Sequence, residues 1–249
     1  MIDSSFPEQV HALLIRYRKQ ASDILDGNME ALVVYGSLAR GDYLPGRSNI
    51  NVLCVPRECS LQALAHCGSI HRRWGKEGII APLVLTRNEL TQFSHRFPLE
   101  CWDMKEQHVV LEGCDPFSDL HVDDTHLMFQ CEQELIGNLI RVRQRYVEGL
   151  ARPEAIAALL PISLNSLLAC FRGLFRVLGY PASGPTTVLL NRLSETLGIE
   201  AKAFDEVWQM KRGLSSPGAL ELPRLLERYL HGLEQAIARF DELKTEGRR

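Results

Sequence analysis

Two short apolar runs joined through a Gly-Ser turn constrain the fold more than any other feature of the sequence. The runs ALVVYG (31–36) and INVLCV (50–55) are rich in β-branched residues and bounded by turn residues, which is typical of buried β-strands. Pro45-Gly46 marks a turn between them. An amphipathic helix is predicted over residues 7–26, where apolar residues recur at helical spacing. We therefore expect a helix followed by two neighbouring strands.

Further strands and helices alternate through the rest of the first half of the chain. The pattern predicts a helix over 60–78 and a third strand over 79–86, in which Pro82 favours an edge or irregular position. Two more short strands are predicted over 98–104 and 107–113. Strands separated by helices make an α/β layer of modest size.

The second half of the chain has a helical apolar period and no credible strand. We therefore expect an α/β (α+β) domain with a mixed sheet over residues 1–120. An all-α helical bundle domain is expected over residues 121–249. The boundary is expected near residues 116–123. The predicted helices of the second half cover residues 123–150, 153–179, 186–197, 200–213 and 221–244.

The composition of the 249-residue chain is that of a soluble globular protein, with 45% hydrophobic and 24% charged residues. A net charge of -3 argues against a chain-wide nucleic-acid surface. We expect no apolar run near the roughly 18 residues of a membrane-spanning helix, and no signal peptide. The seven cysteines are scattered and odd in number, which suits reduced thiols. The expected protein is cytoplasmic, with no membrane or nucleic-acid partner; the oligomeric state stays open, a homodimer included.

Gly36-Ser37 stands where the first strand ends and a helix is expected to begin. Such a turn offers unpaired backbone N–H groups, a hydroxyl and the positive end of a helix dipole, which together suit a phosphate group. Glycine also lets a ligand approach the backbone closely. Taken alone, however, a Gly-Ser pair after a strand is usually only a turn. The next strand carries Asn49 and Asn51, whose side chains face the same side because they are two residues apart.

The segment GSLARGDYLPGRSNINVLCV (36–55) resembles the signature of the DNA-polymerase-β-like nucleotidyltransferase superfamily. That signature consists of Gly-Ser, a spacer of about a dozen residues, and Asp-x-Asp on the next strand. In this chain Gly36-Ser37 occupies the first part, and Asn49-Ile50-Asn51 stands at the Asp-x-Asp positions. The spacer, residues 39–48, is also similar to that of bacterial members.

Two further segments extend the resemblance over most of the chain. The run LECWDM (99–104) is similar to the strand that carries the third carboxylate of the family. The helical second half is similar to the bundle of aminoglycoside-adenylyltransferase-like proteins. The resemblance implies transfer of a nucleotidyl group from a nucleoside triphosphate (NTP), with Mg²⁺ ions held by carboxylates at the reacting phosphate.

The resemblance assigns metal binding to positions 49 and 51, where this chain has amides. Asparagine keeps the shape of aspartate but offers a carbonyl oxygen without the charge. Two such replacements are expected to weaken Mg²⁺ binding and to lower a metal-dependent rate by orders of magnitude. Fewer anions also repel a triphosphate less, so nucleotide binding without metal is expected. Gly36 and Ser37 would contact the nucleotide, and Arg40 and Arg47 would either add compensating charge or be solvated loop residues.

Glu100 and Asp103 are the two candidates for the third, catalytic carboxylate. Glu100 fits the position best, and on a regular strand Asp103, three residues on, would face the opposite side. Only one of them can then point into the site unless the strand is bulged. Either acid could help to deprotonate an acceptor hydroxyl.

Two function classes follow from these residues. The first is a catalytically impaired relative that binds a nucleotide or another phosphorylated small molecule. The second is a working nucleotidyltransferase that modifies a small-molecule or protein hydroxyl with Glu100 or Asp103 and a single metal ion. A separate feature is the arginine-rich segment LIRVRQRYVEGLAR (139–152), which is either a solvated helix face or a basic rim along an inter-domain cleft, where such proteins bind acceptor or nucleotide.

Overall fold

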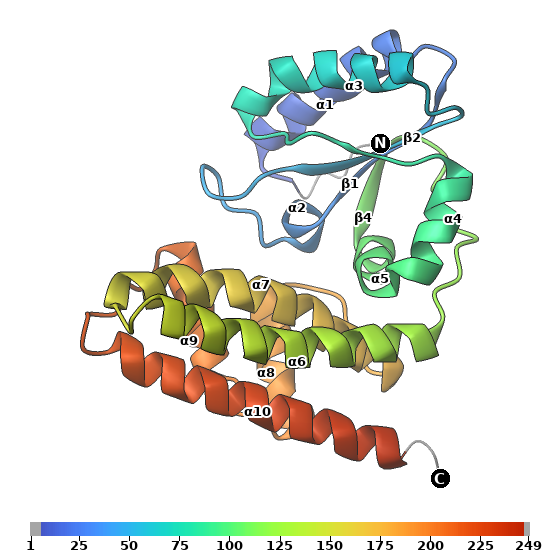
Figure 1. Ribbon diagram of the computed structural model, residues 1–249. Helices are drawn as coiled ribbons and strands as arrows, with labels where there is room; N and C mark the ends of the chain where they lie inside the picture. The colour runs from blue at the N-terminus through green and yellow to red at the C-terminus, as the bar shows by residue number, and fades with distance from the viewer. Residues whose placement is uncertain (1–5, 247–249) are drawn as a thin grey trace. The chain divides into compact units, whose positions relative to one another are not determined.

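The computed structural model describes residues 6–246, and the chain divides into two compact units, Met1–Asp123 and Asp124–Arg249 (Figure 1). The first unit contains a mixed four-stranded sheet with helices. The described part of the second unit is helical. The predicted fold class, an α/β domain with a mixed sheet followed by a helical domain, is confirmed.

The sheet of the first unit has the strand order β3-β2-β1-β4. β1 pairs antiparallel with both β2 and β4, while β2 and β3 are parallel. The two apolar runs predicted as neighbouring strands are therefore neighbours, and β3 lies at the edge that Pro82 favours, although it is much shorter than predicted. The strands are β1 (Met29–Tyr35), β2 (Asn51–Pro56), β3 (Leu83–Val84) and β4 (His108–Gly113).

One face of the sheet packs against α1 (Glu8–Ile24) and α3 (Leu61–Trp74), as Figure 1 shows. Their apolar faces form one core with the alternate residues of the strands that point toward them. Gln20 of α1 accepts a hydrogen bond of 2.9 Å from the indole N–H of Trp74, which ties the two helices together. A short 3-10 helix, η1 (Gly75–Glu77), then leads from α3 to β3.

Two short helices lie on the other side of the sheet, α4 (Arg87–Arg96) and α5 (Pro98–Glu106) (Figure 1). The prediction of a strand over 98–104 is wrong, because this segment is α5. Pro98 occupies the first helical position, where its missing N–H costs nothing, and no residue of the helix is β-branched. These local preferences outweigh the alternation of apolar and acidic residues that suggested a strand.

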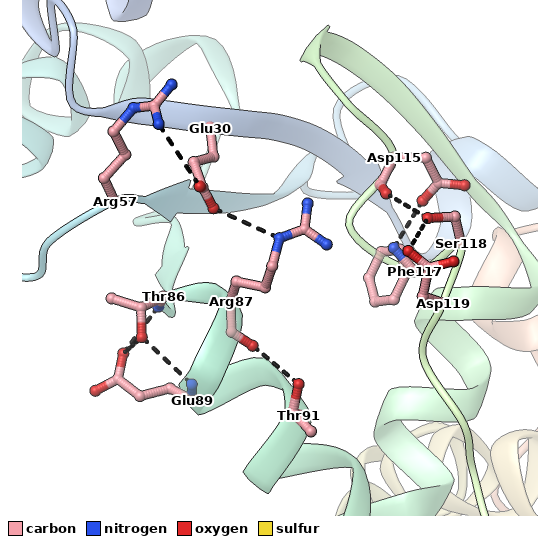
Figure 2. Close-up of polar contacts among 10 residues, drawn as sticks. All are labelled: Glu30, Arg57, Thr86, Arg87, Glu89, Thr91, Asp115, Phe117, Ser118 and Asp119. Atoms are coloured by element: carbon pink, nitrogen blue, oxygen red, sulfur yellow. Dashed lines mark hydrogen bonds and ion pairs between the residues drawn. The ribbon is translucent and has the colours of Figure 1, made fainter.

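Helix α4 was not predicted from the sequence, although its start carries a clear signal. The Thr86 side chain accepts from the backbone N–H of Glu89, and the Glu89 carboxylate accepts from the backbone N–H of Thr86 (Figure 2). This reciprocal capping fixes the first turn of the helix. Arg87 in the same turn lies 3.6 Å from the Glu30 carboxylate of β1, which connects α4 to the sheet.

The second unit has its largest helix–helix contact between α6 and α7, which are joined by a short turn. Its core holds a small polar network: the Asn138 amide donates to the Ser163 carbonyl at 3.0 Å, and the Ser163 hydroxyl lies 2.8 Å from that of Tyr229. Burial raises the pKa of the Tyr229 hydroxyl well above its ordinary value. The helices are α6 (Asp124–Glu148), α7 (Pro153–Val177), α8 (Thr186–Leu197), α9 (Lys202–Arg212) and α10 (Leu222–Glu246).

Helix α7 corrects the expectation that no segment approaches the length of a membrane span. By length and composition α7 is long and apolar enough to cross a membrane. It packs against α6, α8, α9 and α10, and its buried Arg172 donates to the carbonyl of Ala182 at 2.9 Å. The core helix of a helical bundle meets the same length and composition criteria as a membrane span, and the contacts of α7 with four other helices are those of a bundle helix.

Gly113 at the end of β4 provides a test of the β1–β4 pairing. Its φ is +79°, and a Cβ there would lie 1.8 Å from the carbonyl oxygen of Glu30. Gly78 also has a positive φ, +88°, but a Cβ there would meet nothing within 4 Å. In urea unfolding, Gly78→Ala is expected to cost about 1 kcal/mol of backbone strain. Gly113→Ala is expected to cost about 2 kcal/mol or more beyond that, because the strands must separate. Equal costs would contradict the pairing.

Candidate functional site

The candidate site begins in a row of paired residues where β1 ends. Tyr35, the last residue of β1, pairs with Asn51 on β2 and with His108 on β4. Directly paired residues on neighbouring strands project from the same face of a sheet. The side chains of Asn51, Tyr35 and His108 therefore lie in one row beside the turn that follows β1.

Gly36 forms that turn in a conformation that requires glycine. Its φ is +78° and its ψ is -147°, and it is the N-cap of α2 (Ser37–Arg40). A Cβ on Gly36 would lie 2.5 Å from Nδ2 of Asn51. The amide of Asn51 is therefore packed directly against the turn. The predicted helix after Gly36-Ser37 is present but has one turn, so its dipole adds less to anion binding than a longer helix would.

Arg40, the last residue of α2, connects the turn to α5. Its Nη1 donates to Oδ2 of Asp103 at 2.7 Å, and the two side chains are only 19% and 21% exposed. The charge of Asp103 also acts on Tyr35. Burial is the larger cause of the raised pKa of the Tyr35 hydroxyl, and the negative charge of Asp103 raises it further. The ion pair therefore belongs to the same local environment as the Asn51–Tyr35 row.

The structure brings together only some of the residues proposed from the sequence. Gly36, Arg40, Asn51 and Asp103 are gathered around the turn, with Ser37 as the first residue of α2. The remaining three are exposed. They are Asn49, which precedes β2; Arg47, in the loop before it; and Glu100, in the first turn of α5.

The helical conformation of α5 also removes the argument that separated Glu100 from Asp103. On a strand, residues three apart face opposite sides, whereas on a helix they lie on the same side. The reasoning that turned Glu100 toward the site and Asp103 away from it depended on a strand, and the helix no longer separates the two acids in this way. Asp103 reaches the motif through its hydrogen bond with Arg40.

The residues around Asn51 do not fit the Mg²⁺ site that the resemblance implies. Over the described part of the chain, no three His, Cys, Asp or Glu residues are grouped so that they could hold a metal ion. The acid at the motif, Asp103, is paired with Arg40. Leu53 lies two residues after Asn51 on β2 and therefore on the same face of the sheet, and its partner on β3 is Leu83. The face that bears Asn51 thus continues with apolar residues. Mg²⁺ is held in proteins mainly through carboxylates, which this arrangement does not supply.

Tyr35 and His108 belong to the row beside the turn but were not predicted from the sequence. Nδ1 of His108 lies 3.0 Å from the Lys105 carbonyl, and its Nε2 lies 3.2 Å from the Asp115 carboxylate. Both ring nitrogens thus face acceptors, which holds the imidazole in place at the start of β4. Finding His108 required the β1–β4 register. Tyr35 could have been found from its position immediately before Gly36.

Comparisons with known proteins support the fold. No family model and no curated protein matches the chain. Among solved structures, the chain is similar to the spectinomycin adenyltransferase AAD(9) from Enterococcus faecialis, crystallised with ATP and spectinomycin. The TM-score is 0.52 at 12% sequence identity, covering 87% of this chain and 98% of that chain. At this identity the similarity shows a shared fold alone.

The influence of Asp103 on Tyr35 gives a test of the site geometry. Asp103→Asn removes the negative charge that disfavours the tyrosinate, so the pKa of Tyr35 is expected to fall toward 10. Tyrosinate absorbance measures this shift, and Tyr35→Phe identifies the signal. Glu100→Gln, on an exposed residue of the same helix, is the matched control and should not move it. An equal shift in both variants would contradict the placement of Asp103.

The same raised pKa has a consequence for stability at high pH. A folded-state pKa above the unfolded value means that the contribution of Tyr35 is fully present below pH of about 10 and is lost as the pH rises through the folded value. Asp103→Asn lowers the folded-state pKa toward the unfolded value, so the alkaline loss of stability is expected to be smaller than in the wild type and to be complete at a lower pH, as measured by urea unfolding at a series of alkaline pH values. No difference between the two pH profiles would contradict the proposed coupling.

Proposed function

We propose that the protein binds a nucleotide, or another phosphorylated small molecule, at the Gly36–Asn51 turn without Mg²⁺, and that its nucleotidyl-transfer chemistry is impaired. The observation that carries the proposal is the packing of the uncharged Asn51 amide against Gly36, at a position where the related signature has a metal-binding aspartate. In this proposal the protein acts in the cytoplasm, which its seven free cysteines support.

The charge at the turn favours an anion over a metal ion. At a separation of about 5 Å and an effective dielectric constant of about 20, each carboxylate replaced by an amide removes roughly 3 kcal/mol of repulsion toward a phosphate charge. The Nδ2 group of Asn51 is also a hydrogen-bond donor, which a carboxylate is not. The same change removes the charged oxygens that Mg²⁺ prefers. Loss of metal and gain of anion binding therefore have one cause.

Arg40 supplies the positive charge in this proposal. Its guanidinium has five N–H donors, and the hydrogen bond to Asp103 uses one of them. The remaining donors can contact phosphate oxygens while Asp103 orients the group. Arg47 lies in an exposed loop and is proposed to contribute a smaller, more screened attraction.

The second candidate function is an active nucleotidyltransferase that uses Asp103 or Glu100 with a single metal ion. The fold favours it, because the similar adenyltransferase was crystallised with ATP. The two functions differ in their requirement for metal. Incubation with ATP, Mg²⁺ and candidate acceptors, followed by mass spectrometry for transferred AMP, separates them: transfer above background would contradict impairment.

The contribution of arginine is tested by binding of ATP in the presence of a chelator. Arg40→Gln is expected to weaken ATP binding about tenfold, because it removes a partly buried, charge-assisted contact. Arg47→Gln serves as the comparison and should weaken it by less than about threefold, as expected for an exposed charge. Calorimetric titration gives both values. Equal effects of the two substitutions would place the ligand away from the turn.

The role of the Asn49 and Asn51 amides is tested by replacing each of them with aspartate. The double change Asn49→Asp and Asn51→Asp is expected to weaken ATP binding without metal and to create a dependence of binding on Mg²⁺. Because Asn51 contacts Gly36 and Asn49 is exposed, Asn51→Asp alone should produce most of the metal-free loss, and Asn49→Asp alone little. A double variant that binds ATP as the wild type does, with and without Mg²⁺, would contradict the proposed site.

A further inference from the structure

The second unit contains a pocket of about 540 Å³ between α6 and α7. This volume lies within the range of small-molecule sites in proteins. Its α7 wall is mostly apolar and includes Ala155, Ala158, Leu159 and Ile162, while α6 contributes Arg141, Arg145 and the acidic Glu148 that pairs with Arg145. An apolar wall facing two cationic groups is the general composition of a site for an amphipathic anion.

The floor of the pocket is rigid. Asn138 and Ser163 line it and are only 2% and 5% exposed. They are joined by two hydrogen bonds, one from the Ser163 hydroxyl to the Asn138 carbonyl oxygen at 2.6 Å and one from the Asn138 amide to the Ser163 backbone at 3.0 Å. The hydroxyl of Tyr229 on α10 also lies within hydrogen-bond distance, 2.8 Å, of the Ser163 hydroxyl. These hydrogen bonds hold the floor residues in place, so the pocket is preformed.

The turn that closes one end of the pocket is strained. Leu150 and Ala151 have φ values of +51° and +57°, a conformation that costs non-glycine residues roughly 1–2 kcal/mol each. Next to them, a Cβ on Gly149 would lie 2.8 Å from the Cβ of Ala155, so the helices approach closely here. Backbone strain of this kind occurs preferentially at binding sites, where the surrounding structure maintains it.

The apolar wall is incompletely covered by the protein. Ile162, in the middle of α7, is 68% exposed although it lines the pocket. Binding of an apolar group against it would remove that surface from water, at about 25 cal/mol for each Å² buried.

The two arginines have weak partners within the protein. Arg141 is 2.9 Å from the Glu134 carboxylate, and Arg145 is 2.9 Å from that of Glu148, but all four side chains are at least 35% exposed. Ion pairs of this exposure contribute little to stability, and each guanidinium retains further N–H donors. Arg141 and Arg145 are four residues apart, so they are neighbours on one face of α6. Both can contact one anionic group.

We propose that this pocket binds a small amphipathic organic anion, with its apolar body on the α7 wall and its carboxylate, sulfonate or phosphate group between Arg141 and Arg145. The proposal gives Arg141 and Arg145 a binding role within the second unit, which differs from both interpretations of the arginine-rich segment drawn from the sequence. Arg143 is different: it donates to Glu234 of α10 at 2.6 Å and does not line the pocket. The site does not depend on the proposed nucleotide binding.

The test uses the full chain and two fluorescent probes that differ in one group. Anilinonaphthalene sulfonate carries an apolar ring system and one sulfonate, and phenylnaphthylamine is its neutral counterpart. The wild type is expected to bind about one sulfonate probe per chain, more tightly than the neutral probe. The double change Arg141→Gln and Arg145→Gln should weaken sulfonate binding about tenfold and leave the neutral probe unchanged. Arg143→Gln, between them on the same helix, is the matched control and should change neither affinity.

Filling the pocket provides the second arm of the test. Ala158→Trp occupies the space between the helices and is expected to abolish binding of both probes. If its circular dichroism shows that it is unfolded, Ile162→Asp replaces it, because this exposed position tolerates a polar residue and the new charge repels the sulfonate. Equal affinities of the wild type for the two probes, equal effects of Arg143→Gln and the double change, or full binding by a folded Ala158→Trp would each overturn the proposal.

Discussion

The antiparallel pairing of β1 with β2 and β4 is the interaction on which the candidate nucleotide site depends. Residues Ala31 to Val34 of β1 are at most 1% exposed, so the strand is held by packing as well as by its two ladders. A shift of one residue in the register would turn Asn51 to the opposite face of the sheet and away from Gly36. The apolar core therefore fixes the position of the polar groups at the end of the strand.

The local charges at the turn account for the proposed loss of metal chemistry. Where the related signature would place two carboxylates, this chain has an exposed amide at Asn49 and an amide packed on the backbone at Asn51. Asp103, an acid that reaches the turn from α5, is paired with Arg40 at 2.7 Å. A metal ion would have to compete with this arginine for the Asp103 carboxylate. A phosphate would meet a donor amide and a guanidinium instead.

The sequence predicted those parts of the fold that depend on local pattern. The two central strands, the helix at Ser37 and the helices of the second unit each have an apolar period or a turn signal within their own residues. The segment 98–104 was predicted incorrectly, because alternation of apolar and acidic residues was weighed above Pro98 and the absence of β-branched residues. The capping residues Thr86 and Glu89 marked α4 and were overlooked.

The candidate site was less predictable than the fold, because its contacts join distant segments. The ion pair between Arg40 and Asp103 links residues 63 positions apart, and nothing in the local sequence of either residue indicates it. The pairing of Tyr35 with His108 likewise depends on a register that the sequence does not specify. By contrast, the resemblance correctly brought Gly36 and Asn51 together, since the spacer between two adjacent strands returns the chain to the same edge.

The affinity for ATP with and without Mg²⁺ tests the central claim most directly. Calorimetric titration of the wild-type protein, in a chelator and then in excess Mg²⁺, gives the ratio of the two dissociation constants. The account predicts measurable binding in the chelator and a ratio near one, because Asn49 and Asn51 leave the turn without charged metal ligands. Binding that appears only with Mg²⁺, or that tightens by about tenfold or more on its addition, would contradict it.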